Sequence, residues 1–256
     1  MTFIFKIETI KFGMACKWPF DCMTTTISGQ IETPAKLAPH NRWTRLDLAV
    51  LPYSEALDLQ YRLAAQVQSE GKEGIVLFLE HAPVFTLGKR GGCENLTVSD
   101  DFLDKHGVTV FKTERGGNIT YHGPGQLVVY PLIKLKTAGL GVADYVDCLE
   151  EVMLRTAADW GIRAERNVKN RGVWIGNDKL GSIGIAVKRG VTLHGLALNV
   201  VTDLTPFSWI NPCGLTDVGI ISLAEAGAAD ITVARVRERL ATHMAAVFNI
   251  DWEGAT

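Results

Sequence analysis

Residues 173–200, VWIGNDKLGSIGIAVKRGVTLHGLALNV, contain the pattern that decides the fold class. Three runs of mainly apolar residues follow one another here, at 173–175, 184–187 and 193–200. The turn sequences Gly176-Asn177-Asp178 and Lys188-Arg189-Gly190 separate the runs, so we expect strands joined by tight connections. Strands that follow one another without an intervening helix favour an α+β fold over a regular strand–helix alternation.

Helical patterns lie on both sides of these strands in the chain. The helices are expected at 54–68, 142–160 and 233–247, where apolar residues recur at helical spacing. Short apolar runs predict further buried strands at 75–79, 108–111 and 127–133. Ser222 and Glu225 have the spacing of a capping box, which predicts a short helix beginning there.

The length and composition fit one catalytic domain preceded by a tail. The chain has 256 residues, of which 47% are hydrophobic and 21% charged, enough to build a core without disulfides or metals. Residues 1–42 show no clear periodicity and do not match a secretory signal, so we expect a poorly ordered N-terminal extension. Residues 43–256 are expected to form the catalytic domain.

Charge, hydropathy and cysteine usage argue against several classes of protein. The net charge of −2 gives no general attraction to nucleic acid, and no apolar run approaches the ~18 residues of a membrane span. Five widely spaced cysteines without a Cys-x-x-Cys pair argue against a disulfide framework and against a structural zinc site. We therefore expect no nucleic-acid, membrane or metal partner, and a reducing, cytoplasmic compartment.

Cys213 is the candidate nucleophile. It lies in Asn211-Pro212-Cys213-Gly214, where the proline fixes its own φ and the glycine permits a turn and the close approach of a ligand. Such a loop suits a presented thiol, although a buried and inert cysteine is the commoner role of this residue type. The loop by itself leaves both alternatives open.

A glycine-rich stretch, residues 115–126 (RGGNITYHGPGQ), is the candidate ligand-binding segment. Its four glycines suit a backbone that passes close to a ligand and offers N–H and C=O groups to it. The spacing matches neither a phosphate-binding Walker loop nor a dinucleotide fingerprint. A hairpin with unusual turn chemistry is the alternative.

Two further polar positions interrupt the apolar runs of residues 173–200. Lys179 lies at a hairpin end, where most lysines are solvated, but Gly181 and Gly184 follow it on a strand pattern and indicate close backbone approach. His194 precedes Gly195 on the next run, and a single histidine on a strand is more often a structural group than a catalyst.

These segments occur in a characteristic order along the chain: residues 115–126, 179–184, 194–195 and 211–214. Together they resemble the lipoyl(octanoyl) transferases, the octanoyltransferases of lipoate biosynthesis. Residues 79–88 (LEHAPVFTLG) are similar to a further segment of that family, with Ala82 in place of its first proline. The resemblance covers about residues 43–250.

The resemblance implies the fold of the biotin and lipoate protein ligase catalytic domains, a mixed β-sheet flanked by helices. It implies octanoyl transfer without a cofactor or a metal, with Cys213 as the nucleophile that carries the acyl group and Lys179 as the partner that lowers the pKa of its thiol. The implied substrate pocket comprises Arg115, Gly116, Gly117, Asn118, Ile119, Thr120, Tyr121, His122, Ser182, Ile183, Gly184, Gly195, Leu196 and Ala197. His122 is expected to orient the pocket rather than to act as a base.

The implied donor is octanoyl-acyl carrier protein. The implied acceptors are the lipoyl domains of 2-oxoacid dehydrogenase complexes and the H protein of glycine cleavage. Because these carriers are expected to be acidic, a set of basic residues is a candidate docking face, with a solvated charged loop as the alternative: Arg163, Arg166, Lys169 and Arg171. Two other functions stay open, an ATP-dependent lipoate or biotin ligase and a non-catalytic carrier-binding protein.

Overall fold

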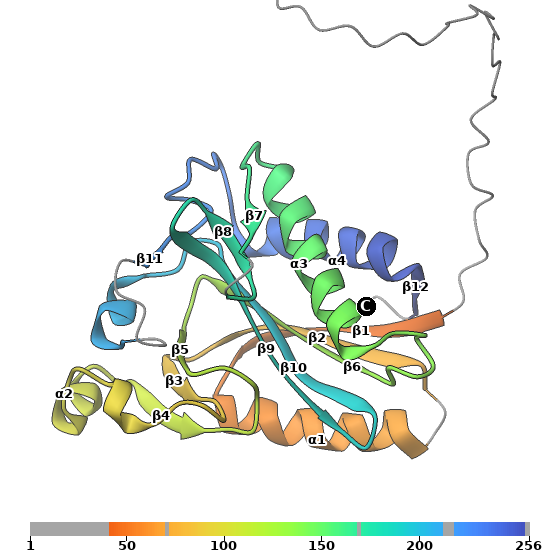
Figure 1. Cartoon of the computed structure of the whole chain (residues 1–256), viewed down its shortest axis with the longest axis horizontal. Helices are drawn as coiled ribbons and strands as arrows, with labels where there is room; N and C mark the ends of the chain where they lie inside the picture. Colours follow the sequence, from red (N-terminus) through yellow and green to blue (C-terminus); the bar gives the residue numbers. More distant parts are fainter. Residues whose placement is uncertain (1–40, 70–71, 168–169, 212–217, 254–256) are drawn as a thin grey trace, which may run out of the picture. The chain divides into compact units, whose positions relative to one another are not determined.

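The computed structural model describes residues 41–69, 72–167, 170–211 and 218–253 (Figure 1). The helices are α1 (Tyr53–Ser69), α2 (Asp100–Lys105), α3 (Val142–Ala158) and α4 (Val233–Phe248), with short 3-10 helices at Cys93–Asn95 and Thr205–Trp209. The strands are β1 (Asn41–Leu51), β2 (Gly74–His81), β3 (Val84–Leu87), β4 (Thr109–Lys112), β5 (Ile119–His122), β6 (Gln126–Ile133), β7 (Glu165–Arg166), β8 (Val173–Ile175), β9 (Asp178–Lys188), β10 (Val191–Asn199), β11 (Gly219–Ile220) and β12 (Ile250–Glu253).

The described residues form one large mixed sheet of nine strands, in the order β12-β1-β2-β6-β10-β9-β8-β7, with β11 paired to β9. β1 runs parallel to both of its neighbours, whereas β2, β6, β10, β9, β8 and β7 pair antiparallel with one another in that order. β8, β9 and β10 are consecutive both in the chain and in the sheet, so the connections predicted within residues 173–200 are confirmed. The predicted α+β class with a mixed sheet is confirmed as well.

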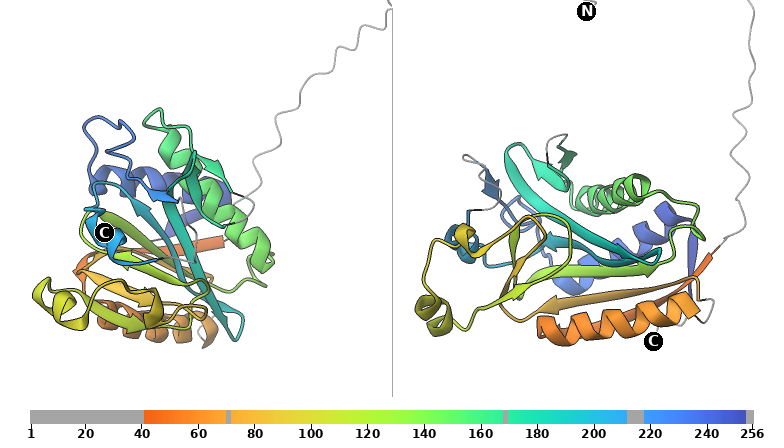
Figure 2. Two further views of the ribbon diagram at one scale, coloured as in Figure 1. Left: turned by 60° about the vertical axis from the view of Figure 1, so that its left-hand side comes forward. Right: turned by 60° about the horizontal axis from the view of Figure 1, so that its bottom comes forward.

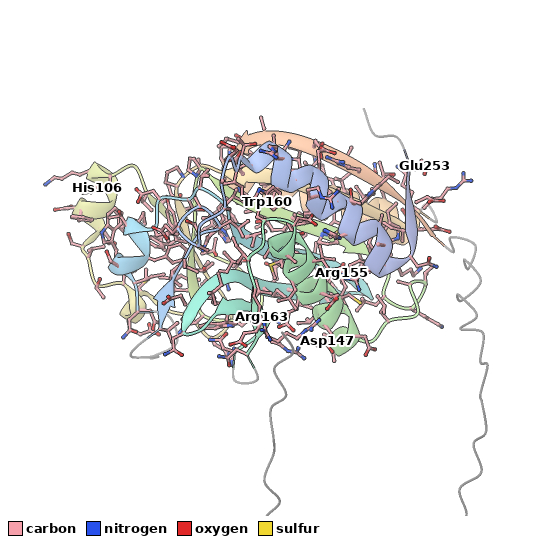
Figure 3. The ribbon with its side chains drawn as sticks, turned by 90° about the horizontal axis from the view of Figure 1, so that it is seen from above. His106, Asp147, Arg155, Trp160, Arg163 and Glu253 are labelled. Carbon is pink, nitrogen blue, oxygen red and sulfur yellow. The ribbon has the colours of Figure 1, made fainter. Side chains whose placement is uncertain are left out.

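Helices cover both faces of this sheet (Figure 2). α1 packs on one face, where Ala56 and Val67 join the apolar cluster formed by β2 and β6. α3 and α4 lie side by side on the other face (Figure 3), and their residues Tyr145, Leu149 and Met244 are fully buried. In each helix the buried residues follow the helical spacing that its sequence shows.

The second, smaller sheet has the order β4-β3-β5. β3 is parallel to β4 and antiparallel to β5, which places Thr86 opposite Thr120. β5 leads into β6 of the large sheet through Gly123-Pro124-Gly125, and Gly125 has a left-handed φ of 83°. The end of the glycine-rich stretch is therefore one connection between the two sheets, and residues 82–83, between β2 and β3, are another.

The three predicted long helices are confirmed, and their ends lie within two residues of those expected. The short helix expected from Ser222 is wrong. The capping-box hydrogen bonds do form, because the Glu225 N–H donates to Ser222 Oγ at 3.2 Å and the Ser222 N–H donates to Glu225 Oε2 at 3.3 Å. The chain makes only a hydrogen-bonded turn, since Gly227 adopts a φ of 99° and Asp230 a φ of 49°, which no helix continues through.

Most of the predicted N-terminal extension, residues 1–40, lies outside the described residues, and β1 begins at Asn41. Within residues 41–69, 72–167, 170–211 and 218–253, none of the helices combines the length and the apolar character that crossing a bilayer requires.

Candidate active site

A cavity of ≈ 780 Å³ opens where the small sheet meets β9 and β10 of the large sheet. Its walls include the predicted pocket residues Arg115, Gly116, Gly117, Asn118, Ile119, Thr120, His122, Ser182, Ile183, Gly184, Gly195, Leu196 and Ala197, together with Lys179. Segments that are far apart in the sequence are thus brought to one cavity. Its volume falls within the range of small-molecule sites.

One described residue of the predicted site, Tyr121, does not belong to the cavity wall. Its buried ring packs against Phe85 and Phe207, with ring centroids 5.5 and 5.6 Å away. Cys213 lies outside the described residues. The described chain on either side of it reaches the cavity, because Ile210 and Val218 both belong to the wall.

Glycines at the centre of the cavity wall let backbone segments approach one another. Gly184 of β9 lies directly opposite Gly195 of β10. A Cβ atom at Gly195 would lie 2.1 Å from the carbonyl oxygen of Val129, and one at Gly184 would lie 3.0 Å from Cδ of Arg115. The Gly116 N–H also donates to the carbonyl oxygen of Ile185 at 2.8 Å, which fixes the glycine-rich stretch to β9.

Lys179 marks one end of the cavity. Its Nζ donates to Oδ1 of Asn170 at 3.0 Å and lies 5.1 Å from the ring centroid of Trp174. Register explains the second contact, because Lys179 of β9 pairs with Trp174 of β8. We call Asn170, Trp174 and Lys179 the lysine region. It is partly open to solvent, since the Lys179 side chain is half-buried.

A cluster of buried rings forms the other end, and we call it the histidine cluster: Tyr53, His81, His122, Tyr130 and His194. All but His81 belong to the cavity wall. His194 lies opposite Ile185, which is six residues from Lys179 on β9, or about 20 Å along a strand. The lysine region therefore lies near the start of β9, whereas the histidine cluster lies beside the middle of the β9–β10 ladder.

Hydrogen bonds fix the tautomer of His81 and of His122, that is, which ring nitrogen carries the proton. Nδ1 of His81 donates to the carbonyl oxygen of Leu51 at 3.0 Å, so its Nε2 accepts from the Tyr130 hydroxyl at 2.7 Å. The Gln126 amide NH₂ donates to Asn199, so its oxygen accepts from Nδ1 of His122 at 2.7 Å.

All three histidines are held in the neutral form at neutral pH. Burial lowers the pKa of His81 to about 4. Burial also lowers the pKa of His194 to about 4, although the nearby Glu114 carboxylate opposes this shift. The pKa of His122 falls well below its usual value, first through burial and then through the neighbouring His81. An orienting role for His122 fits this chemistry better than proton transfer at neutral pH.

Arg115 supplies a positive charge beside this neutral cluster. The residue is buried, and its Nε and Nη2 donate to Oγ1 of Thr86 at 3.1 and 2.9 Å. The Thr86 hydroxyl lies 3.4 Å from Nε2 of His122, the ring nitrogen left as an acceptor. The arginine is thus anchored on β3 and faces the cavity.

His194 owes its position to an irregular backbone. It has a φ of 58°, rare for a residue that is not glycine, and its N–H donates to Oε1 of the buried Gln60 at 2.7 Å. In the sequence, His194 has the pattern of a structural histidine on a strand, and Tyr53 and Tyr130 lie in no recognisable motif. Only the glycine after His194 hints at the irregularity.

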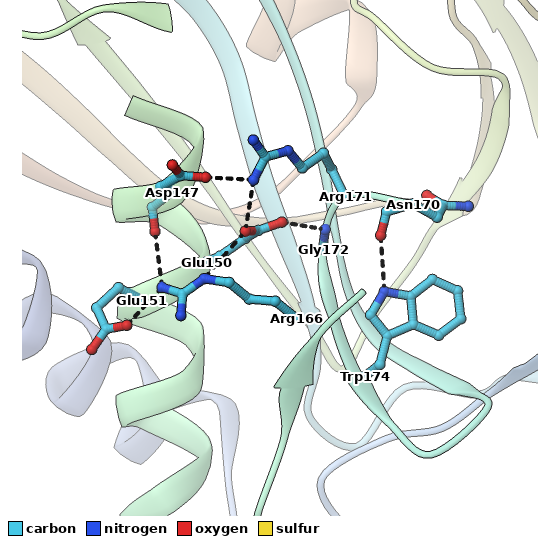
Figure 4. Close-up of polar contacts among 8 residues, drawn as sticks. All are labelled: Asp147, Glu150, Glu151, Arg166, Asn170, Arg171, Gly172 and Trp174. Carbon is cyan, nitrogen blue, oxygen red and sulfur yellow. Dashed lines mark hydrogen bonds and ion pairs between the residues drawn. The ribbon is translucent and has the colours of Figure 1, made fainter. Parts of the chain in front are cut away.

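The predicted basic docking face is largely neutralised where it is described. Arg166 and Arg171 form ion pairs with carboxylates of α3, namely Asp147, Glu150 and Glu151 (Figure 4). Lys169 lies outside the described residues. Arg163 lies between the end of α3 and the start of β7. Arg166 and Arg171 therefore tie this segment to α3, and the docking role stays a prediction.

Comparison with known sequences agrees with these features. The family model of the lipoyl protein ligase A/B catalytic domain matches residues 52–245. The octanoyltransferase of Desulfotalea psychrophila is 53% identical over 174 residues, which cover 67% of this chain and 78% of that protein. The octanoyltransferase of Syntrophobacter fumaroxidans is 43% identical over 211 residues, 82% of this chain and 92% of that protein. The chain belongs to the octanoyltransferase family. It is accordingly an acyltransferase.

Solved structures show the same fold at low sequence identity. Lipoate-protein ligase A bound with ATP is 19% identical with a TM-score of 0.67, over 84% of this chain and 88% of that one. LipL1 of P. falciparum in complex with lipoate is 13% identical with a TM-score of 0.65, over 82% of this chain and 66% of that one. The predicted ligase-type catalytic fold is confirmed for this octanoyltransferase-family chain.

Proposed function

We propose that this chain transfers an octanoyl group from octanoyl-acyl carrier protein to a lysine of a lipoyl domain through a thioester on Cys213. The supporting observation is that one cavity is lined by Lys179, the glycine-rich stretch and the β9–β10 glycines. Its wall also contains Ile210 and Val218, which lie on either side of Cys213 in the sequence. The acceptors would be lipoyl domains of 2-oxoacid dehydrogenase complexes and the glycine cleavage H protein, in a reducing cytoplasm. A solved lipoate ligase of this fold, from Thermoplasma acidophilum, was studied with its E2 lipoyl domain.

The first step is a thioester exchange. The Cys213 thiolate attacks the carbonyl carbon of the octanoyl thioester, and the carrier thiolate leaves and takes up a proton. A free cysteine with a pKa of ~8.5 is only a few per cent thiolate at pH 7. The Lys179 ammonium would favour the thiolate, and a pKa lowered by about two units corresponds to roughly 2.7 kcal/mol.

The second step forms the amide. The neutral amine of the acceptor lysine attacks the Cys213 thioester, the amine loses its proton, and Cys213 leaves as the thiolate. Lys179 is the candidate to accept that proton when it is itself deprotonated. Because both bonds that break are thioesters, neither step consumes ATP.

The apolar part of the cavity wall suits a medium-length acyl chain. Ile183, Leu196 and Ala197 lie on the paired strands beside Gly184 and Gly195, where backbone can lie against the chain. At ~0.8 kcal/mol per buried CH₂, six methylenes would contribute on the order of 5 kcal/mol before ordering costs.

Intact-mass analysis tests this function. After mixing with octanoyl-acyl carrier protein and no ATP, we expect an octanoyl adduct on the wild type that hydroxylamine removes. The adduct is expected to be absent from Cys213→Ala and slow to form on Lys179→Ala. Pyrophosphate release that depends on free octanoate and ATP would instead indicate a ligase. Tight carrier binding by the wild type without any adduct would indicate a non-catalytic protein.

A further inference from the structure

Asn170 binds both other members of the lysine region, Lys179 through its side chain and Trp174 through its backbone. Its Oδ1 accepts from Nζ of Lys179 at 3.0 Å. Its carbonyl oxygen accepts from Nε1 of Trp174 at 3.1 Å (Figure 4). Trp174 is 2% exposed, so its indole is a rigid support for Asn170 on one side and for the lysine ammonium on the other. The ammonium is therefore held by an amide oxygen and an aromatic face together.

A buried carboxylate of α3 fixes the segment that carries Asn170. The Glu150 side chain is 1% exposed; its Oε1 accepts from the Gly172 N–H at 2.9 Å and its Oε2 from Nη1 of Arg171 at 3.1 Å. Gly172 has a φ of 123°, and a Cβ atom there would lie 2.3 Å from the carbonyl oxygen of Gly181 on β9. The segment is thus tied to α3 by hydrogen bonds and lies directly against β9.

The arginines and the lysine of this part of the molecule are bound by groups of different charge. The carboxylates of Asp147, Glu150 and Glu151 bind Arg166 and Arg171. The group from this segment that binds Lys179 is instead a neutral amide, which orients an ammonium without cancelling its charge. A carboxylate at the same place would offset the field that a nearby thiolate feels.

We infer that Asn170 is a positioning residue for the proposed reaction, which fixes the place of the Lys179 ammonium with a neutral oxygen and so adds no negative charge beside it. The inference rests on the proposed function only in taking Lys179 as the partner of Cys213. Glu150 acts indirectly, because it binds Arg171 and the Gly172 N–H and so fixes the backbone next to Asn170. Neither residue is required to touch the acyl group.

The reactivity of Cys213 with iodoacetamide, followed against pH by peptide-resolved mass spectrometry, tests the inference without turnover. Asn170→Asp has nearly the same shape and places a carboxylate beside the ammonium. We expect it to slow the alkylation of Cys213 at pH 7 about three- to tenfold and to move the profile toward alkaline pH, since one pKa unit is a tenfold change in thiolate. Asn170→Ala, which removes the oxygen without adding charge, is expected to shift the profile in the same direction by less.

Controls separate this inference from the proposed function. Asn249→Asp makes the same substitution at the end of α4 and is expected to leave the profile unchanged. If Lys179→Ala shifts the profile while folded Asn170→Asp and Asn170→Ala do not, the positioning role is wrong and the Lys179–Cys213 pair stands. If Lys179→Ala leaves the profile unchanged as well, the pair itself is wrong.

Discussion

The two ends of the cavity are stabilised in different ways. The histidine cluster is almost fully buried, electrically neutral and held by hydrogen bonds from α1, β2, β5 and β10. The lysine region is charged, partly exposed and held by one short segment that ion pairs fasten to α3. We therefore expect substitutions at the histidine end to reduce the stability of the fold. Substitutions at the lysine end should change reactivity more than stability.

Gly195→Ala is expected to reduce stability most. Gly195 directly follows His194 of the histidine cluster on β10. The new methyl group would lie 2.1 Å from a backbone oxygen of β6, which cannot move without disturbing the central sheet. We expect the free energy of unfolding, measured in urea, to fall by about 3 kcal/mol or more. Gly184→Ala, directly opposite, is the matched control, because its nearest neighbour would be Cδ of Arg115 at 3.0 Å, so a much smaller shift would accommodate its methyl group. Equal losses for the two variants would contradict this account.

Thr86→Val tests whether the buried arginine depends on its hydroxyl partner. Valine keeps the shape of threonine but removes the oxygen that accepts from Nε and Nη2 of Arg115. Since hydrogen bonds to charged groups contribute about 1.5–3 kcal/mol, we expect a loss of about 2 kcal/mol in the free energy of unfolding. Thr86→Ser keeps the oxygen and should lose only about 1 kcal/mol, for one missing methyl group. A larger loss for serine than for valine would show that packing, not hydrogen bonding, stabilises this position.

Local sequence patterns predicted the elements whose formation depends on residues that are close together in the sequence. The strands of residues 173–200 and the three long helices form where apolar spacing and turn residues agree. β1 was not predicted, because its residues alternate irregularly and its partners, β2 and β12, lie far away along the chain. At Ser222 a capping-box pattern did not lead to a helix, because Gly227, five residues later, has a backbone conformation that a helix cannot contain.

The cavity was predictable from its glycines but not from its aromatic residues. Clustered glycines indicated close backbone approach, the family resemblance implied the individual pocket residues, and most of these residues line the cavity. Tyr121 does not, because its ring packs against Phe85 and Phe207, on the face of β5 opposite that of Thr120 and His122. Tyr53, Tyr130 and Asn170 stand alone in the sequence, so only the folded sheet shows their proximity to the site.

The pH dependence of stability offers a smaller and graded test of the buried histidines. Because burial lowers the pKa of His81 to about 4, the unfolded chain binds a proton there first as the pH falls. The stabilisation is complete above the unfolded pKa of ~6.5 and is lost as the pH falls from there toward about 4. For His81 alone this is about 2 kcal/mol between pH 7 and pH 5.

His81→Gln supplies the comparison, since glutamine can donate to Leu51 and accept from Tyr130 without titrating in this range. Urea unfolding of both proteins at pH 7, 6 and 5 should show a steeper loss of stability for the wild type. Parallel curves would mean that His81 does not carry the predicted share of the pH dependence.

Glu151→Gln is expected to have the smallest effect and tests the lysine end. Its carboxylate bonds Arg155 at 2.9 Å and Arg166 at 2.7 Å, but the side chains involved are 32%, 48% and 43% exposed. Exposed pairs of this kind contribute less than about 1 kcal/mol, and salt weakens them further. Urea unfolding at low and high salt should therefore show a small loss that disappears at high salt.

Glu150→Gln, one residue earlier, is the natural counterpart. Glu150 is 1% exposed and bonds the Gly172 N–H and Arg171, so we expect a larger loss, about 2 kcal/mol, that salt hardly changes. If Glu151→Gln cost as much as Glu150→Gln, the surface ion pairs would be the main support of the segment that carries Asn170. The stability of the lysine end would then fall as the ionic strength rises, whereas the stability of the buried histidine end would not. The two ends would differ mainly in how strongly salt screens their charges, and not in how deeply they are buried.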